Sequence, residues 1–363
     1  MDEAIAEILS SFGLDAGDCA IQPVGSGHIH DTYRIDSVSS GSPPLLLQKI
    51  NTRVFTDPAL LMRNLERVST HIARKHKEKG EDPAQKGIVL LETTEGKSWT
   101  GNETSGYWRM CWFLQDLVIY EQAPHPKIAW EGGRAIAEFQ GLVQDLDPTL
   151  INDVIEGFHD LKLRMEQFKR SLSEGLSDRI RKAAREIQLA KQEYERSLSL
   201  YTVSEKLDFP IRLNHNDTKL NNILFSKEGQ ACCMIDLDTV MKGYSWFDFG
   251  DALRTCASSA NEDEANQEKI EFLPDTFKAF SAGYLSLASA YLHEDERAHL
   301  HLAPAVMTYM QGLRFLTDYL MGDIYYKSRE KELNLVRARG QFLLMQKMHA
   351  REKEMAETIR NLS

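Results

Sequence analysis

The stretch from Leu213 to Phe225 constrains this chain more than any other. It reads Leu-Asn-His-Asn-Asp-Thr-Lys-Leu-Asn-Asn-Ile-Leu-Phe, which is the pattern His-x-Asp-x-x-x-x-Asn followed by an apolar strand. Phosphoryl transfer needs a carboxylate that accepts or orients the proton of the attacking hydroxyl, and an amide oxygen on Mg²⁺ a few residues later. Asp217 and Asn222 have this spacing. The sequence therefore predicts a catalytic loop, with Asp217 as the catalytic residue and Asn222 as a magnesium ligand.

A second acidic motif follows at the distance that such a loop requires. Residues Cys233 to Asp238 form an apolar run that ends in Asp-Leu-Asp. Mg²⁺ binds few carboxylates and completes its shell with phosphate oxygens and water, so we predict Asp236 as the main metal ligand. Asp238 is either a second ligand or a turn residue. Asp248, between aromatic residues, is expected to be a buried hydrogen-bond acceptor that braces the catalytic loop.

Near the N-terminus, Val24 to Tyr33 reads as a glycine turn between two short strands. Glycines let backbone N–H groups approach a phosphate closely, although Gly-Ser-Gly is also an ordinary hairpin turn. Together with the two motifs above, Gly25, Ser26 and Gly27 are interpreted as a cover over nucleotide phosphates.

The position where kinases carry a strand lysine is occupied by Gln48, and Lys49 comes one residue late. Neighbouring side chains on a strand point to opposite faces unless a bulge intervenes. Lys49 is kept as a nucleotide-binding candidate, with Glu66 as its candidate partner. Lys219, two residues after Asp217, is the catalytic candidate that meets the transferring phosphate.

The order of patterns indicates an α+β chain with two lobes. A small β-rich N-terminal lobe, residues 1–115, is expected to bind nucleotide, and a larger, mainly helical C-terminal lobe, residues 116–363, to carry catalysis and substrate binding. The predicted strands lie within 21–36, 42–51, 87–92 and 106–114, and the predicted helices within 57–76, 133–146, 165–201 and 272–363. Asp57 and Pro58 form the expected start of the first of these helices.

Composition excludes several other classes. The net charge of -11 and the lack of a basic stripe disfavour a nucleic-acid partner. No apolar run approaches the roughly 20 residues of a membrane-spanning helix, and the acidic N-terminus is unlike a secretory signal. We therefore expect a cytoplasmic protein that binds no membrane, and the five cysteines are expected to be reduced thiols. The sequence leaves the oligomeric state open.

The motifs together resemble the aminoglycoside phosphotransferase-like kinases, a family of protein-kinase-like fold, and within it the kinases of N-acetylhexosamines. The resemblance spans nearly the whole chain and includes Gly25-Ser-Gly-His-Ile29, Asn51-Thr52, Leu61-Met-Arg-Asn64, His215 to Leu224, Ile235 to Thr239, Phe247 to Asp251, Arg314-Phe-Leu316, Asp318-Tyr-Leu320, Gly322-Asp323 and Asn334 to Arg337.

This resemblance implies ATP and Mg²⁺ as cofactors and a sugar as the acceptor, phosphorylated at the anomeric hydroxyl of N-acetylglucosamine or N-acetylgalactosamine. It also implies that His28, Arg314 and Tyr325 bind sugar hydroxyls beside Asp217, and that Ile21 lines the acetamido pocket. From the residues alone these could be a turn histidine, a surface arginine and a core aromatic. Open alternatives are another acceptor, such as an aminoglycoside, homoserine, choline or a different sugar, and a non-catalytic nucleotide-binding protein.

Overall fold

The computed structural model describes residues 3–24, 29–39, 41–326 and 330–362. It divides into two compact units. The first comprises Met1–Leu117, Asp145–Ile155 and Leu237–Val240, and the second comprises Val118–Gln144, Glu156–Asp236 and Met241–Ser363. The predicted α+β class, with a β-rich N-terminal part and a larger helical C-terminal part, is confirmed.

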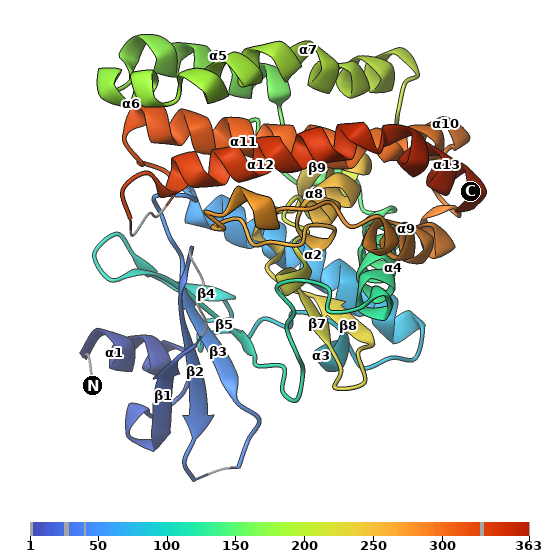
Figure 1. The fold of residues 1–363 in the computed structure, drawn as a ribbon. Coiled ribbons are helices and arrows are strands. Elements are labelled where there is room, and N and C mark those ends of the chain that lie inside the picture. Colours follow the sequence, from blue (N-terminus) through green and yellow to red (C-terminus); the bar gives the residue numbers. More distant parts are fainter. Residues whose placement is uncertain (1–2, 25–28, 40, 327–329, 363) are drawn as a thin grey trace. The chain divides into compact units, whose positions relative to one another are not determined.

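The first unit is built on a five-stranded antiparallel sheet in the order β1-β2-β3-β5-β4 (Figure 1). Leu9 of helix α1 and Phe12, just after that helix, pack with Leu47 and Met110 of the sheet in a buried apolar cluster. Helix α2 begins as predicted, because Asp57 caps it by accepting a hydrogen bond from the N–H of Leu60. The elements of this unit are α1 (Glu3–Ser11), β1 (Cys19–Pro23), β2 (Asp31–Ser37), β3 (Leu45–Lys49), α2 (Pro58–Glu78), α3 (Pro83–Lys86), β4 (Trp99–Asn102) and β5 (Gly106–Trp112), with the 3₁₀ turns η1 (Ala16–Asp18), η2 (Pro148–Leu150) and η4 (Leu237–Thr239).

One predicted strand of this unit is wrong and another was missed. The segment 87–92 is no strand, and it touches β5 only through an isolated bridge between Leu90 and Cys111. The edge strand is β4, which lies between the predicted strands 87–92 and 106–114, where no strand was predicted. Gly101 has a φ of 107° in this strand, and a Cβ atom there would collide with the carbonyl of Gly106. Glycine is therefore a steric requirement of this hairpin and does not end the strand.

The second unit is mainly helical. Most residues of helix α11 are buried, because it packs against α12, α8, α5 and α7. Helix α4 packs along α9 (Figure 1). Two short two-stranded sheets, β6 with β9 and β7 with β8, flank the predicted catalytic motifs. The elements are α4 (Pro126–Val143), α5 (Leu161–Glu174), α6 (Ser177–Lys182), α7 (Ala184–Lys206), β6 (Arg212–Asn214), β7 (Ile223–Phe225), β8 (Ala231–Met234), β9 (Met241–Gly243), α8 (Trp246–Cys256), α9 (Pro274–Ala288), α10 (Glu294–His299), α11 (Ala303–Met321), α12 (Leu333–Ala350) and α13 (Glu352–Leu362), with the 3₁₀ turns η3 (Leu220–Asn222), η5 (Gln267–Lys269) and η6 (Leu300–Leu302).

Two helix boundaries of the second unit differ from the prediction. The stretch 165–201 is not one helix but parts of three, and the first break falls at Gly175, where a Cβ atom would meet the carbonyl of Leu320. Helices also resume earlier than residue 272, because α8 begins at Trp246. Nearly every residue of α8 is buried, so it lacks the amphipathic stripe by which a helix is recognised in a sequence.

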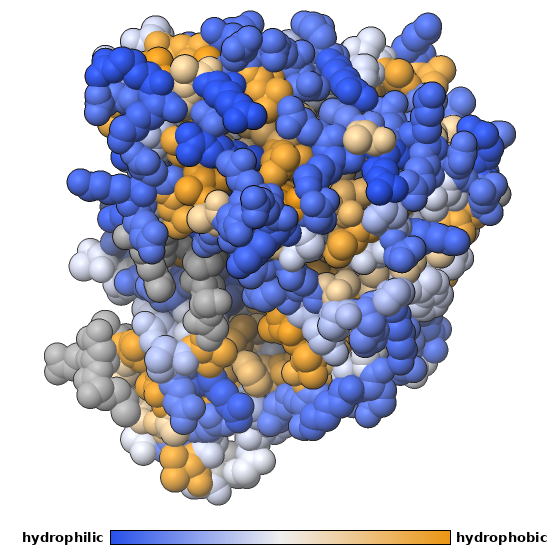
Figure 2. All heavy atoms as spheres, viewed as in Figure 1, coloured by the Kyte–Doolittle hydropathy of each residue, from blue (hydrophilic) through white to orange (hydrophobic). Residues whose placement is uncertain are grey.

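The state of the cysteines and the polarity of the surface can be compared with what the composition predicted. All five cysteines are free thiols, as predicted, and Cys111, Cys233 and Cys256 are buried. Hydrophilic residues cover most of the face shown in Figure 2, with hydrophobic residues in separate groups among them. Across the part of the chain that the structure describes, no helix is long and apolar enough to cross a membrane.

Candidate active site

The predicted catalytic loop lies in the second unit, between β6 and β7. The side-chain Nδ2 of Asn222 donates hydrogen bonds to the backbone carbonyl of Asp217 (2.8 Å) and to its carboxylate Oδ2 (3.1 Å). These bonds hold the two residues at a fixed separation and orient the amide of Asn222. Its Oδ1, the atom that a metal ion would take, is not used by them.

Lys219 is the cation of this loop. Its Nζ lies 3.2 Å from Oδ1 of Asp217, and the negative charge of Asp217 raises the pKa of Lys219 above its ordinary value. The ammonium group is therefore charged at neutral pH. The structure thus brings together the two residues that the sequence proposed as catalytic.

His215 connects the loop to the strand that leads to Asp236. Its Nε2 lies 2.8 Å from the carbonyl of Ile235, and its Nδ1 lies 3.3 Å from the backbone N–H of Asp217. A carbonyl can only accept and an N–H can only donate, so Nε2 carries a proton and Nδ1 is the acceptor. The N–H of Ile235 in turn donates to the carbonyl of Asn222 (2.9 Å). These hydrogen bonds join the loop that contains Asn222 to Ile235, the residue before Asp236. They therefore connect the backbones of the two predicted magnesium ligands.

Two residues of this site have left-handed backbone conformations. Asn216 has a φ of 65° and Asp236 a φ of 61°. Asparagine and aspartate tolerate this region better than other residues that carry a Cβ atom, and such conformations are frequent at active sites. Asn216 lies directly before Asp217, and Asp236 lies two residues after the end of β8, so each conformation sets the direction of a predicted site carboxylate.

Asp248 braces the catalytic loop from helix α8, as the sequence predicted. Its carboxylate accepts from the backbone N–H groups of His215 (2.9 Å) and Asn216 (2.8 Å) and from the side chain of Gln140 (3.0 Å). Burial raises the pKa of Asp248 to about 6. Because the carboxyl group is fully enclosed by these donors, its role is structural.

His159 also contacts this loop, and it was not predicted. It precedes the loop in the chain, whereas Asp248 follows it. This buried side chain lies with Nε2 3.0 Å from the carbonyl of Asn216, and its own carbonyl accepts from the hydroxyl of Tyr201. Burial, followed by the charge of Arg314, lowers the pKa of His159 to about 3. Only a contact between residues 57 positions apart identifies it, so no local motif could have found it.

In the first unit, Gln48 and Lys49 point to opposite faces of the sheet, as expected of an unbulged strand. Gln48 pairs with Arg109 of β5 and accepts a hydrogen bond from its Nε (3.0 Å), whereas Lys49 pairs with Trp108 and places its Nζ 5.4 Å from that ring. Lys49 as a nucleotide-binding residue stays a prediction. Glu66, its candidate partner, accepts a hydrogen bond from Ser98 and makes no ion pair within the described residues.

Arg109 forms a buried ion pair with Asp238 that the sequence did not predict. Its Nη1 and Nη2 both donate to the carboxylate of Asp238, the second at 2.8 Å. The Arg109 guanidinium and His30 hold the pKa of Asp238 far below its ordinary value. Both residues are buried, so the carboxylate is ionised and neutralised in place.

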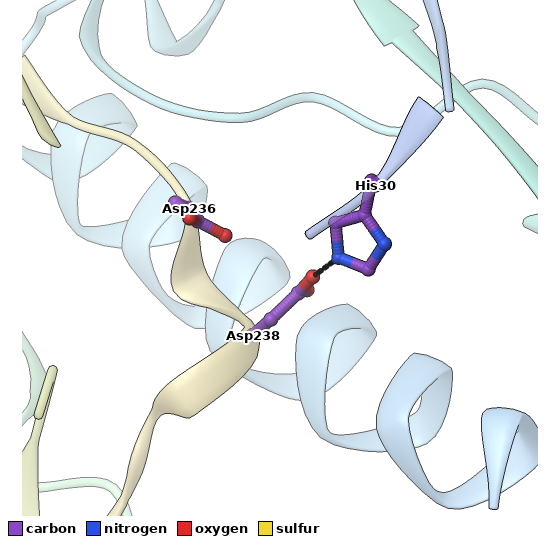
Figure 3. A group of neighbouring side chains, drawn as sticks. All are labelled: His30, Asp236 and Asp238. Atoms are coloured by element: carbon purple, nitrogen blue, oxygen red, sulfur yellow. Dashed lines mark hydrogen bonds and ion pairs between the residues drawn. The ribbon is translucent and has the colours of Figure 1, made fainter. Parts of the chain in front are cut away.

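His30 completes the set of donors around Asp238 (Figure 3). Its Nε2 lies 2.6 Å from Oδ2 of Asp238, and its Nδ1 accepts from the backbone N–H of Asn51 (3.1 Å). The proton must therefore be on Nε2, which donates it to the carboxylate. Asp238 lies in a 3₁₀ turn, and both of its carboxylate oxygens accept hydrogen bonds from Arg109 or His30. This favours the interpretation of Asp238 as a turn residue over that of a second metal ligand. Figure 3 also labels Asp236, two residues earlier in the chain.

The predicted acceptor-binding residues Arg314 and Tyr325 lie together in the second unit. The guanidinium carbon of Arg314 is 5.8 Å from the ring centroid of Tyr325, 5.6 Å from that of Tyr326 and 4.7 Å from that of Phe158. Asp318 fixes the tyrosine segment by accepting from the backbone N–H groups of residues 325 and 326. Tyr325 is 46% exposed, so its ring is accessible.

The remaining predicted residues are placed as follows. Gly25, Ser26, Gly27 and His28 lie outside the described residues. Ile21 is in β1 and packs against the apolar cluster of the first unit.

A carboxylate, a lysine and an amide in one loop, with an acid shortly after the adjoining strand β8, are the groups that phosphoryl transfer requires. The comparisons agree, since the model of the phosphotransferase enzyme family (APH) matches residues 20–288. The chain belongs to this family of phosphotransferases.

Solved structures confirm the kinase-like fold. The microcompartment-associated aminopropanol kinase has a TM-score of 0.64 and 16% identity, with 96% of this chain and 98% of that chain covered. A choline kinase from Cryptosporidium parvum Iowa II has a TM-score of 0.55 and 14% identity over 99% of both chains. A spectinomycin phosphotransferase in complex with ADP and spectinomycin has a TM-score of 0.53 and 15% identity over 99% of this chain and 98% of that one.

Proposed function

We propose that the protein is an N-acetylhexosamine 1-kinase, which transfers the γ-phosphoryl group of ATP to the anomeric hydroxyl of N-acetylglucosamine or N-acetylgalactosamine. The observation that carries the kinase part is the set formed by Asp217, Lys219, Asn222 and Asp236 in the second unit. The resemblance of the whole sequence to kinases of these sugars supports the acceptor.

In this mechanism the acceptor oxygen forms a bond to the γ-phosphorus while the bond from that phosphorus to the bridging oxygen breaks, and ADP leaves. Asp217 orients the hydroxyl and takes its proton. Lys219, held 3.2 Å from Asp217, supplies positive charge where the transferring group becomes more negative.

The residues present fit a magnesium ion. Mg²⁺ prefers oxygen ligands and usually binds only one or two carboxylates, and the protein offers Oδ1 of Asn222 and the carboxylate of Asp236. When bound, Mg²⁺ would neutralise charge on the phosphates. On the side of the protein, the bonds from Asn222 to Asp217 keep the amide oriented for this task.

The alternative acceptors are compounds such as aminopropanol and choline, after which two of the structural neighbours are named. Both are cations at neutral pH. In this chain the predicted acceptor residues include the guanidinium of Arg314, which is surrounded by aromatic rings. A cation here disfavours a cationic acceptor and favours a neutral one rich in oxygen.

A panel of acceptors in an ADP-release assay tests this proposal, with N-acetylglucosamine, N-acetylgalactosamine, galactose, homoserine, choline and an aminoglycoside. We expect the two N-acetylhexosamines to be the best acceptors. ³¹P NMR of the product then distinguishes the 1-phosphate from the 6-phosphate. Turnover of another acceptor, with none of either sugar, would refute the proposed acceptor and leave the family assignment intact.

Removal of the lysine beside Asp217 should slow the chemical step. We expect Lys219→Ala to lower the single-turnover rate at least roughly tenfold, about 1.4 kcal/mol of transition-state stabilisation, and Lys49→Ala to cost less. The reason is that Lys219 contacts the catalytic carboxylate whereas Lys49 lies over the ring of Trp108. A larger loss in the Lys49 variant would assign the phosphate-binding cation to the strand.

A further inference from the structure

Two arginines of the second unit meet at Phe158. Nε and Nη2 of Arg164, on α5, donate to the backbone carbonyl of Phe158 at 3.3 and 3.1 Å. The guanidinium of Arg314, on α11, lies over the ring of the same residue. Burial, followed by the charge of Arg314, lowers the pKa of Arg164 to about 10. The two guanidinium groups are therefore close enough to repel each other.

Neither arginine forms an ion pair with a carboxylate within the described ranges. Their other hydrogen bonds go to the neutral side chains of Gln167 (2.9 Å) and Gln311 (3.1 Å). Arg254 of the same unit shows the usual arrangement for a buried arginine, because it pairs with both Asp251 and Glu262. Two partly buried guanidinium groups that have no carboxylate in direct contact among the described residues favour a ligand that brings oxygen acceptors to them.

This pair is connected directly to the catalytic loop. His159 follows Phe158 in the chain and bonds through Nε2 to the carbonyl of Asn216, the residue before Asp217. Because that carbonyl only accepts, Nδ1 of His159 carries a lone pair, and it is a buried atom without a hydrogen-bond partner among the described residues. A hydroxyl can donate to this nitrogen and accept from a guanidinium, whereas an ammonium group can only donate.

We propose that Arg164, Arg314 and His159 form an acceptor subsite that takes hydroxyl and carbonyl oxygens and excludes protonated amines. The inference rests on the proposed function to the extent that the acceptor binds beside Asp217. It adds two specificity-determining residues, Arg164 and His159. It also defines the acceptors as neutral compounds that carry hydroxyl or carbonyl oxygens.

The test pairs each neutral acceptor that is turned over with its amino analogue: N-acetylglucosamine with glucosamine, and glucose with glucosamine. We expect kcat/KM at pH 7 to favour the neutral member at least roughly tenfold, because an amine of ordinary pKa is mostly protonated there. Arg164→Gln should reduce this ratio several-fold, and Arg164→Lys, which keeps the charge, should preserve it. Arg170→Gln is the matched control, since Arg170 is an exposed residue of the same helix that pairs only with Glu174 in the described structure.

If Arg164→Gln turns over too slowly, the inhibition constant of glucosamine with Arg314→Gln gives the same information, and it should fall. An unchanged ratio in the Arg164→Gln variant, or choline or aminopropanol as the best acceptor of the wild type, would overturn the subsite. If the N-acetylhexosamines fail but another neutral acceptor shows the charge discrimination, the proposed sugar is wrong and the subsite stands.

Discussion

Replacing Asp217 with asparagine is expected to lower kcat roughly a thousandfold, because proton transfer by a positioned side chain contributes about 10²- to 10⁴-fold to rate. The substitution keeps the shape of the side chain and its contact with Asn222, but it removes the basic oxygen and the partner of Lys219. Nucleotide affinity should stay nearly unchanged, since the carboxylate acts on the acceptor hydroxyl. The two quantities are measured by steady-state kinetics and by calorimetric titration with ATP.

Asp275→Asn is a suitable control, because it makes the same chemical change at an exposed position in the first turn of α9. It should leave both quantities as in the wild type. A near-normal kcat in the Asp217 variant would remove Asp217 from the mechanism, and a parallel loss of ATP affinity would place it at the nucleotide.

The catalytic loop could be predicted because its chemistry is local in sequence. Asp217 and Asn222 are five residues apart, and the hydrogen bonds between them close a loop whose length the sequence alone gives. Asp236 ends the adjoining hairpin, in which Ile223 pairs with Met234, so its approach to Asn222 follows from an ordinary antiparallel ladder. Residue type and spacing were therefore sufficient to predict that these residues lie near one another.

The supporting contacts could not be predicted, because they join residues far apart in the chain. Arg109 reaches Asp238 across 129 positions, and His159 reaches Asn216 across 57. From the sequence, Gln48 occupies the position of the usual strand lysine, and Lys49 with Glu66 was only a candidate pair. In the structure Gln48 accepts a hydrogen bond from Arg109 of the neighbouring strand, and Arg109 pairs with Asp238. A single sequence carries no local signal for contacts between residues so far apart in the chain.

Substitution of the predicted metal ligand should separate the two acids of the Asp-Leu-Asp motif. We expect Asp236→Asn to lower kcat roughly a hundredfold and to raise the Mg²⁺ concentration needed for half-maximal rate, because one of the few carboxylates available to the ion is lost. ATP binding should weaken in the presence of Mg²⁺ and change little without it. Calorimetric titrations with and without the metal measure this difference.

Asp238→Asn is the matched comparison, and a different result is expected. Its carboxylate is the counterion of the buried Arg109 and accepts from His30, so the substitution leaves a buried guanidinium without a negative partner. Breaking such a pair typically costs about 3–5 kcal/mol, which should appear as a lower melting temperature while the Mg²⁺ midpoint of the folded enzyme stays constant.

If the Asp238 variant instead shifts the Mg²⁺ midpoint as the Asp236 variant does, both acids bind metal and Arg109 must release Asp238 when the ion enters. An unchanged midpoint in the Asp236 variant would mean that the ion is held by other ligands, and that the left-handed turn at Asp236 serves the backbone alone.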